Sequence, residues 1–135
     1  MQIDRQHLLG VRERAELIAD KAHLSRIMDR MAKEVEAAVG DSDPLILCVM
    51  TGGMVTASEL FTRLGCLAQL DYLHATRYQG TRGGSELKWI APPSQVLAGR
   101  TLVVVDDILD EGVTLAAILD FCRDQQAKAV YSAVL

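Results

Sequence analysis

The sequence predicts an α/β fold with a central, mainly parallel sheet flanked by helices and a protruding flexible loop. Two continuous apolar runs, residues 44–50 and 101–105, have the length and the borders of strands that are buried on both faces. A segment with helical spacing of apolar residues follows each run. Strand and helix signals therefore alternate along the chain, which favours parallel strands joined by crossover helices.

Composition limits the class of protein. The length of 135 residues fits a single domain over residues 1–135, large enough to bury a core without disulfides or a metal. The net charge of −4 comes with no basic stripe, so we expect no nucleic-acid partner. No apolar run approaches about 18 residues, and the N-terminus lacks the basic and apolar pattern of a secretory signal. We therefore expect no membrane partner.

The cysteines predict a reducing compartment. Cys48, Cys66 and Cys122 lie far apart, and each sits in an apolar pattern, so we expect buried, reduced thiols. Disulfides are rare in the cytoplasm, and a chain without them most simply belongs there. The three histidines show no ligand spacing, which gives no support to a zinc site.

The N-terminal half predicts a helical region, a strand and a further helix. Apolar residues recur at helical spacing over residues 12–39, which indicates one long amphipathic helix or a pair of helices. The strand of residues 44–50 leads through a Gly-Gly turn into a helix over residues 54–65, and Gly65 is expected to end that helix.

The C-terminal half predicts four strands, a loop and a helix. The strands are expected within residues 66–78, 86–93, 101–107 and 127–135. Residues 79–85 contain three glycines and no large apolar side chain, which predicts an exposed, mobile loop. A helix with one apolar face is expected over residues 112–125, and Trp89 is expected to pack on the sheet.

The segment VVVDDILDEGVTL, residues 103–115, carries the candidate chemistry. Asp106, Asp107 and Asp110 follow the apolar strand directly, and a glycine turn and a helix come next. Ligands of open parallel sheets gather at the carboxyl ends of the strands. A helix N-terminus offers unpaired amides and the positive end of a dipole, so residues 110–114, with the Thr114 hydroxyl, predict a cradle for a phosphate monoester.

Carboxylates beside a phosphate need a task of their own. Two unit charges about 5 Å apart repel by roughly 3 kcal/mol at an effective dielectric constant of about 20. Asp106 and Asp107 can instead accept hydrogen bonds from vicinal sugar hydroxyls, or hold the water shell of Mg²⁺. A ligand with a phosphate, a diol and a magnesium ion would use every group of the bend. The opposing interpretation is a solvated strand end in which Asp110 caps the helix.

The same segment resembles the phosphoribosyl pyrophosphate motif of the type I phosphoribosyltransferases. The shared pattern is an apolar strand, an acidic pair, two apolar residues, Asp, one residue, Gly, one residue and Thr. The Gly-Gly turn after the first strand and the segment TRYQGTRGG, residues 76–84, follow the order of the hypoxanthine-guanine branch. The resemblance covers residues 12–135. It implies the fold of that family and a homo-oligomer, either a dimer or a tetramer.

The resemblance implies a role for each matching position. Asp106 and Asp107 would bind the ribose hydroxyls and Mg²⁺, directly or through water, and Asp110 would be the general base. The other implied roles are 5′-phosphate binding by Asp110, Glu111, Gly112, Val113 and Thr114, pyrophosphate binding by Thr51, Gly52 and Gly53, and closure of the flexible loop with Arg77 and Tyr78. Closure of that loop would exclude water, which competes as a nucleophile.

The chain departs from the family pattern in several places. Glu111 stands where the purine enzymes commonly carry Thr, so we expect its side chain to point outward and only its amide to be used. Thr51 stands where they often carry Lys, and the lost cation would have to come from Arg77 or Arg82. The chain ends at Leu135, where the base-reading segment of the family should begin. We therefore expect a truncated chain, and the alternative is that it keeps only the sugar-phosphate half of the site.

The activity implied by the resemblance is purine salvage. The enzyme would transfer the 5-phosphoribosyl group from phosphoribosyl pyrophosphate to hypoxanthine or guanine and release pyrophosphate. The other interpretation is a non-catalytic module of the same fold, which binds phosphoribosyl pyrophosphate or a nucleotide and regulates a partner. The missing base-reading segment favours the module. The glycine-rich loop favours the enzyme, because a lid that excludes water serves catalysis.

Overall fold

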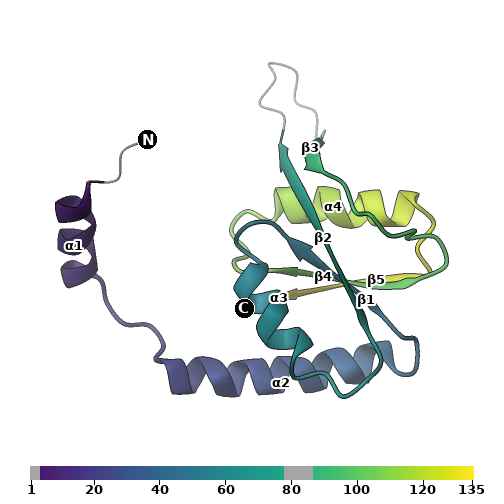
Figure 1. Cartoon of the computed structure of the whole chain (residues 1–135), viewed down its shortest axis with the longest axis horizontal. Coiled ribbons are helices and arrows are strands. Elements are labelled where there is room, and N and C mark those ends of the chain that lie inside the picture. Colours follow the sequence, from purple (N-terminus) through teal and green to yellow (C-terminus); the bar gives the residue numbers. More distant parts are fainter. Residues whose placement is uncertain (1–3, 78–86) are drawn as a thin grey trace.

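The computed structural model describes residues 4–77 and 87–135. Within them, five strands form one sheet with the order β3-β2-β1-β4-β5 (Figure 1). The elements are α1 (Arg5–Arg14), α2 (Lys21–Val39), β1 (Leu45–Val49), α3 (Met54–Phe61), β2 (Gln69–Arg77), β3 (Leu87–Ala91), β4 (Thr101–Asp106), α4 (Val113–Asp124) and β5 (Ala129–Val134). The predicted α/β fold with a central, mainly parallel sheet is confirmed.

β1 forms the centre of the sheet and runs parallel to both of its neighbours. Leu45 is in register with Gln69 of β2 on one side and with Leu102 of β4 on the other. β5 continues the parallel arrangement beyond β4, whereas β3 pairs with β2 in antiparallel fashion. The carboxyl ends of the four parallel strands therefore lie at one edge of the sheet, which is where ligands of such sheets bind.

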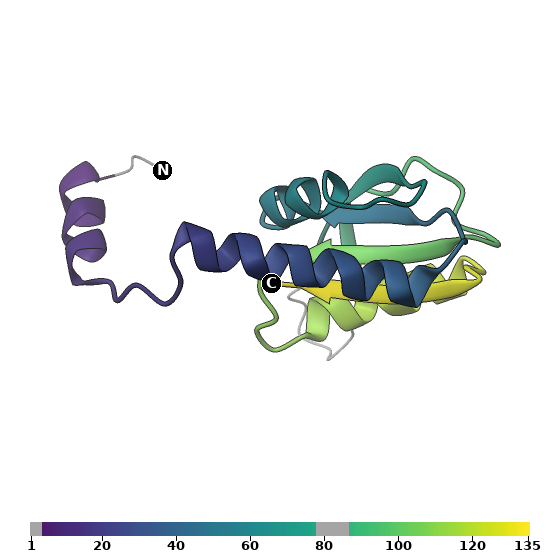
Figure 2. The same cartoon turned by 90° about the horizontal axis from the view of Figure 1, so that it is seen from below.

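Helices cover both faces of the sheet (Figures 1 and 2). α2 and α3 pack on one face, in a core that includes Met28 and Leu60. α4 packs on the other face, in a core that includes Ile118 and Cys122. All five residues of β1 are buried, as its continuous apolar sequence predicts for a strand covered on both faces.

The helical region expected over residues 12–39 is a pair of helices, and the first begins earlier than expected. α1 starts directly after Asp4. α2 starts after Asp20, whose carboxylate accepts a hydrogen bond from the backbone N–H of His23 at 2.7 Å. Leu17, which was expected on a helix, lies in the link between the two and is 78% exposed. Each helix thus begins at an aspartate N-cap, which apolar periodicity alone does not detect.

α3 ends earlier than the sequence predicted. Its last helical residue is Phe61, and the Thr62 hydroxyl donates a hydrogen bond back to the carbonyl of Glu59 at 3.1 Å. The backbone N–H of Gly65 donates instead to the side-chain carboxylate of Glu36 on α2. The prediction that Gly65 ends the helix is therefore wrong, because this glycine ties the following loop to α2.

The remaining elements lie within their predicted ranges, with shorter ends. β2 begins at Gln69, so Leu67 lies outside the strand and is 78% exposed. Trp89 of β3 is half-buried, and its ring lies 4.6 Å from the ring of Phe121 on α4, which confirms that it packs against the layers of the sheet. The loop predicted over residues 79–85 lies outside the described residues.

All three cysteines have free thiols, as expected, but only two of them are fully buried. Cys48 and Cys122 lie in the core, and burial raises the pKa of the Cys122 thiol to about 11. Cys66 is half-buried, so the prediction of a fully buried thiol is wrong at this position. In the part of the chain that the structure describes, no helix combines the length and the hydropathy needed to cross a membrane.

Candidate functional site

The acidic bend after β4 opens onto a cavity of about 350 Å³ at the carboxyl edge of the sheet. The end of β1 and Gly52 line one side of this cavity, and Ala75 and Arg77 of β2 line another. Residues 106–115 form the remaining wall. Three neighbouring parallel strands, β2, β1 and β4, thus converge on one cavity, as the sheet order requires.

Asp106 and Asp107 make local hydrogen bonds that fix the start of the bend. Asp106 Oδ1 accepts from the N–H of Asp107, and Asp107 Oδ1 accepts from the N–H of Ile108, both at 2.9 Å. Burial raises the pKa of the Asp106 carboxyl, and the charge of Asp107 adds to the rise, although the hydrogen bond from the Asp107 amide opposes it. The ionised form of Asp106 is therefore destabilised in this site. A cation or a hydroxyl donor from a ligand would stabilise this carboxylate.

The two glycines after β1 allow a close approach to the bend. A Cβ atom added to Gly52 would lie 2.6 Å from Asp107 Oδ1, so the backbone of this turn packs directly against the second carboxylate. A Cβ atom added to Gly53 would lie 2.6 Å from the carbonyl oxygen of Val105 and 2.7 Å from that of Val49. Glycine is thus required for a steric reason at Gly53, where the obstacle is backbone, whereas at Gly52 the obstacle is a side chain. Of these two glycines, only Gly52 lines the cavity.

The first turn of α4 presents backbone amides to the cavity. Gly112 is the N-cap and has a left-handed conformation, with φ of 75° and ψ of 0°, which glycine adopts without strain. No side chain caps the helix, which contradicts the opposing interpretation, in which Asp110 serves as the cap. The first amides of α4 are thereby left for a ligand, and Thr114 lines the same cavity with its side chain half-buried.

The structure brings most of the predicted site residues together. Asp106, Asp107, Asp110 and residues 111–114 all line the cavity, and Glu111 is exposed, as its predicted outward orientation requires. Thr51 and Gly53 do not line it: Thr51 is exposed to solvent and Gly53 is buried beneath the turn. The expected loop residues Tyr78 and Arg82 lie outside the described residues.

The sequence analysis assigned no role to two apolar residues of the site. Ile108 and Leu109 separate the aspartates and line the cavity, yet they are 69% and 60% exposed. An apolar pair placed between acidic residues in a bend, outside any strand or helix, is a signal that the sequence contained. The site therefore joins carboxylates, backbone amides and an exposed apolar surface, which together suit a ligand with polar and apolar parts.

The donor set of the bend suits a hard divalent cation held partly by other ligands. The described residues contain no group of three or more His, Cys, Asp or Glu side chains placed to hold a metal. Asp106 and Asp107 nevertheless supply adjacent carboxylate oxygens at the cavity. Mg²⁺ prefers oxygen ligands and usually keeps several waters or shares substrate phosphates, so two carboxylates fit this ion better than a metal that needs a closed protein shell.

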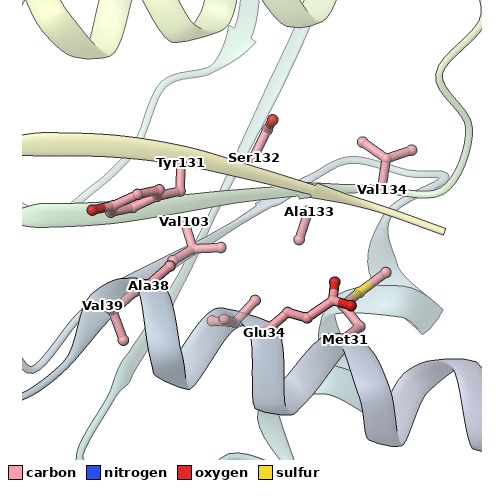
Figure 3. A pocket seen from close by; sticks show the side chains of 10 residues that line it. Met31, Glu34, Ala38, Val39, Val103, Tyr131, Ser132, Ala133 and Val134 are labelled. Atoms are coloured by element: carbon pink, nitrogen blue, oxygen red, sulfur yellow. The ribbon is translucent and has the colours of Figure 1, made fainter.

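A second cavity, of about 220 Å³, lies between α2 and β5 and shares no lining residue with the first (Figure 3). Met31 and Glu34 of α2 line it, together with Val103 and Ala133 of the sheet. Among the described residues that line it, Glu34 alone carries a charge. This cavity lacks a cluster of reactive or charged groups, so the candidate site remains at the carboxyl edge of the sheet.

The fold is a doubly wound α/β fold, and the candidate ligand site lies at the carboxyl ends of its parallel strands. A model of the phosphoribosyl transferase domain matches residues 14–135, and the chain belongs to this family, with the type I fold that its motif implied. The match begins two residues after the limit expected from the resemblance.

The relatives of the chain include several hypoxanthine-guanine phosphoribosyltransferases. The enzyme of Lactococcus lactis is 30% identical over 113 residues, which cover 83% of this chain and 58% of the relative. The hypoxanthine-guanine-xanthine phosphoribosyltransferase of Tritrichomonas foetus is 29% identical over 90 residues, which cover 67% of this chain and 49% of the relative. The chain thus spans about half the length of these relatives.

Solved structures of the same kind share the fold. A hypoxanthine-guanine phosphoribosyltransferase from Bacillus anthracis superposes with a TM-score of 0.83 at 21% identity, over 90% of this chain and 72% of that one. A purine phosphoribosyltransferase from Pyrococcus horikoshii gives a TM-score of 0.68 at 27% identity, over 83% of this chain and 71% of that one.

Proposed function

We propose that the site binds 5-phosphoribosyl pyrophosphate with Mg²⁺ and transfers the phosphoribosyl group to hypoxanthine or guanine. The observation that carries the proposal is the single cavity that joins the acidic pair, the free first turn of α4 and the glycine turn after β1. These are the groups needed for a diol, a phosphate monoester and a close backbone approach to a further phosphate. Membership of the phosphoribosyltransferase family supports the same conclusion.

Each part of the sugar phosphate has a matching group in this proposal. Asp106 and Asp107 accept hydrogen bonds from the ribose hydroxyls. The amides of residues 110–114, with the Thr114 hydroxyl, hold the 5′-phosphate at the positive end of the α4 dipole. The backbone of the turn at Thr51, Gly52 and Gly53 would face the pyrophosphate, with Gly52 lining the cavity and Gly53 packed beneath it against β1 and β4.

The transfer exchanges one bond to the anomeric carbon for another. The bond from that carbon to the pyrophosphate oxygen breaks with its electron pair on the oxygen, and a ring nitrogen of the purine forms the new bond. Asp110 accepts the proton that this nitrogen loses. Bound Mg²⁺ would neutralise charge on the departing pyrophosphate. The acidic pair, by its own negative charge, would favour the positive charge that develops on the sugar ring.

A purine base and a second copy of the chain complete the proposed partners. Ile108 and Leu109 offer exposed apolar surface beside Asp110, which suits the face of a planar base. Relatives of this chain named for their activity on hypoxanthine, guanine or xanthine support a purine. A homo-oligomer and a cytoplasmic location remain part of the proposal.

The alternative is a non-catalytic module that binds phosphoribosyl pyrophosphate or a nucleotide and regulates a partner. It is favoured by the residues that line the cavity. The described residues contain the sugar and phosphate groups of the site but no aromatic side chain among those that line the cavity. Binding without transfer would be the mark of this alternative.

One experiment separates the two candidates. Isothermal titration calorimetry of the 135-residue chain with phosphoribosyl pyrophosphate and Mg²⁺ tests the site itself. Radiolabelled hypoxanthine, guanine and xanthine, each incubated with the same sugar substrate, then test the transfer by the appearance of labelled nucleotide. Binding with nucleotide formation supports the enzyme, and binding with no nucleotide supports the module. A chain that is folded by circular dichroism and binds no sugar substrate would contradict both.

A further inference from the structure

We infer that Arg77 supplies the cation for the pyrophosphate group of the substrate, and so selects a diphosphorylated sugar over a sugar monophosphate. The inference rests on the proposed function and deepens it, because it assigns the selection of substrate to one side chain of β2. It concerns a different strand from the one that carries the acidic bend.

Arg77 lies at the edge of the sheet where the cavity opens. It is the last residue of β2 and lines the same cavity as the acidic bend. Leu73 of β2 is in register with Val49, the last residue of β1, and its carbonyl accepts a hydrogen bond from the N–H of Met50 at 2.8 Å. Arg77 lies four residues further along, which is roughly 13 Å of extended strand beyond the end of β1.

Arg77 matters for an anionic ligand because acidic residues outnumber basic ones among the described residues that line the cavity. Among the described residues that line it, Arg77 is the one basic residue, whereas four are acidic: Asp106, Asp107, Asp110 and the exposed Glu111. A ligand with several phosphate charges would meet net repulsion from these side chains. A guanidinium forms bidentate, charge-assisted hydrogen bonds with phosphate oxygens, which makes it the group best suited to offset that repulsion.

The turn after β1 cannot take this role. Its residues are Met50, Thr51, Gly52 and Gly53, none of which carries a charge. Thr51 is exposed and does not line the cavity. The turn therefore contributes backbone alone, and among the described residues a side-chain cation for the outer phosphates comes from a neighbouring strand. β2 is the strand next to β1 on the side away from the acidic bend, and Arg77 is its cation at the cavity.

The arginine is also available for a ligand. It is exposed, and it forms no ion pair with any other residue that the structure describes. The two phosphate groups of the substrate then bind to different parts of the site. The 5′-phosphate lies on the amides of α4, and the pyrophosphate lies between the glycine turn and Arg77. Loss of Arg77 should therefore weaken the binding of one phosphate group and leave the other unchanged.

Calorimetry with two ligands tests this division on the full 135-residue chain. Phosphoribosyl pyrophosphate and ribose 5-phosphate, each with Mg²⁺, are titrated into the wild type, Arg77→Ala and Arg26→Ala. Arg26 is an exposed arginine on α2 that lines no part of the site, so its variant controls for net charge. We expect Arg77→Ala to bind phosphoribosyl pyrophosphate about 10- to 100-fold more weakly, and ribose 5-phosphate within about threefold of the wild type.

A rescue variant provides a second, independent measurement. The variant Arg77→Lys keeps a positive charge at the end of β2, and we expect it to bind phosphoribosyl pyrophosphate at least about fivefold more tightly than Arg77→Ala. Equal affinity of Arg77→Ala and the wild type for phosphoribosyl pyrophosphate would overturn the inference, and so would an equal loss for both ligands. An Arg77→Lys variant that binds no better than Arg77→Ala would also count against it. Failure of the wild type to bind either ligand would instead overturn the proposed function, and the inference with it.

Discussion

The carboxylate of Asp106 is partly buried and lies next to the carboxylate of Asp107. This arrangement lowers the stability of the fold. Burial raises the pKa of Asp106 and the charge of Asp107 raises it further. A group with a raised pKa in the folded state contributes stability that is present below its unfolded pKa and is lost as the pH rises through its folded pKa. At neutral pH the ionised carboxylate therefore lowers the free energy of unfolding.

Replacement of this charge should stabilise the protein. Asp106→Asn keeps an oxygen that can accept the hydrogen bond from the Asp107 amide and removes the repulsion. We expect the melting temperature at pH 7 to rise by about 1–3 °C, and the gain to fade below about pH 4, where the wild type is protonated. Thermal unfolding followed by circular dichroism over this pH range checks the result, with the exposed Asp124→Asn as control. A lower melting temperature at pH 7 would contradict the electrostatic argument.

Gly52 and Gly53 make contacts of different kinds, and their alanine variants should separate function from stability. The clash at Gly53 is with the backbone carbonyls of two central strands, which cannot move aside. Gly53→Ala should therefore lower the free energy of unfolding by about 1–3 kcal/mol in a urea titration. The clash at Gly52 is with the Asp107 carboxylate, a side chain that can turn away.

Gly52→Ala is accordingly expected to unfold within about 0.5 kcal/mol of the wild type. Because its Cβ displaces Asp107, it should bind phosphoribosyl pyrophosphate and Mg²⁺ about tenfold more weakly in calorimetry. Unchanged binding would show that the position of the Asp107 carboxylate does not depend on this turn. A loss of stability as large as that of Gly53→Ala would show that this carboxylate cannot turn away.

At the scale of elements, Asp71 ties β2 to the connector that leads into β4. It is only 7% exposed, and its carboxylate accepts hydrogen bonds from the backbone N–H groups of Tyr72, Ser94 and Gln95 at 2.8–2.9 Å. Burial acts to raise the pKa of Asp71, but these hydrogen bonds outweigh it, so the pKa lies below its usual value. The stability from this group is therefore present above its unfolded pKa and is lost as the pH falls through its folded pKa.

In Asp71→Asn, the side-chain NH2 group would replace one of the two oxygens that accept hydrogen bonds from backbone N–H groups. Two donors would then face each other without an acceptor. We expect Asp71→Asn to lower the free energy of unfolding at pH 7 by about 2 kcal/mol, and the difference from the wild type to shrink below about pH 4. Urea titrations at pH 7 and at pH 3 measure both effects, and the exposed Asp41→Asn is the matched control. A difference that stays constant with pH would show that the charge of Asp71 is not what stabilises the connector.

The sequence predicted those elements whose signals are local. β1 and residues 102–105 of β4 are continuous apolar runs, and their complete burial near the centre of the sheet follows from that pattern. The end of α3 was not predicted, because it depends on the contact between Gly65 and Glu36, which lie 29 residues apart. The acidic bend was recognised because its groups are contiguous. The contact between Gly52 and Asp107 was not, since it exists only because β1 and β4 are neighbours in the sheet.

At the scale of the whole molecule, α1 stands apart from the layers around the sheet (Figures 1 and 2). None of its residues is buried, and the link that joins it to α2 exposes 95% of Ile18. The family match also begins at residue 14, where α1 ends. The cooperative unit therefore runs from α2 to β5, and α1 adds almost no buried apolar surface to it.

Removal of residues 1–14 is a test of this limit. Because α1 buries nothing, we expect the shortened chain to unfold at the same urea concentration as the full chain, with a free energy of unfolding within about 0.5 kcal/mol. Asp20→Ala is the matched comparison, since it removes the N-cap of α2 and should cost about 1 kcal/mol. A deletion that destabilises the protein more than Asp20→Ala would show that α1 packs against the rest of the molecule in solution. The cooperative unit would then include α1.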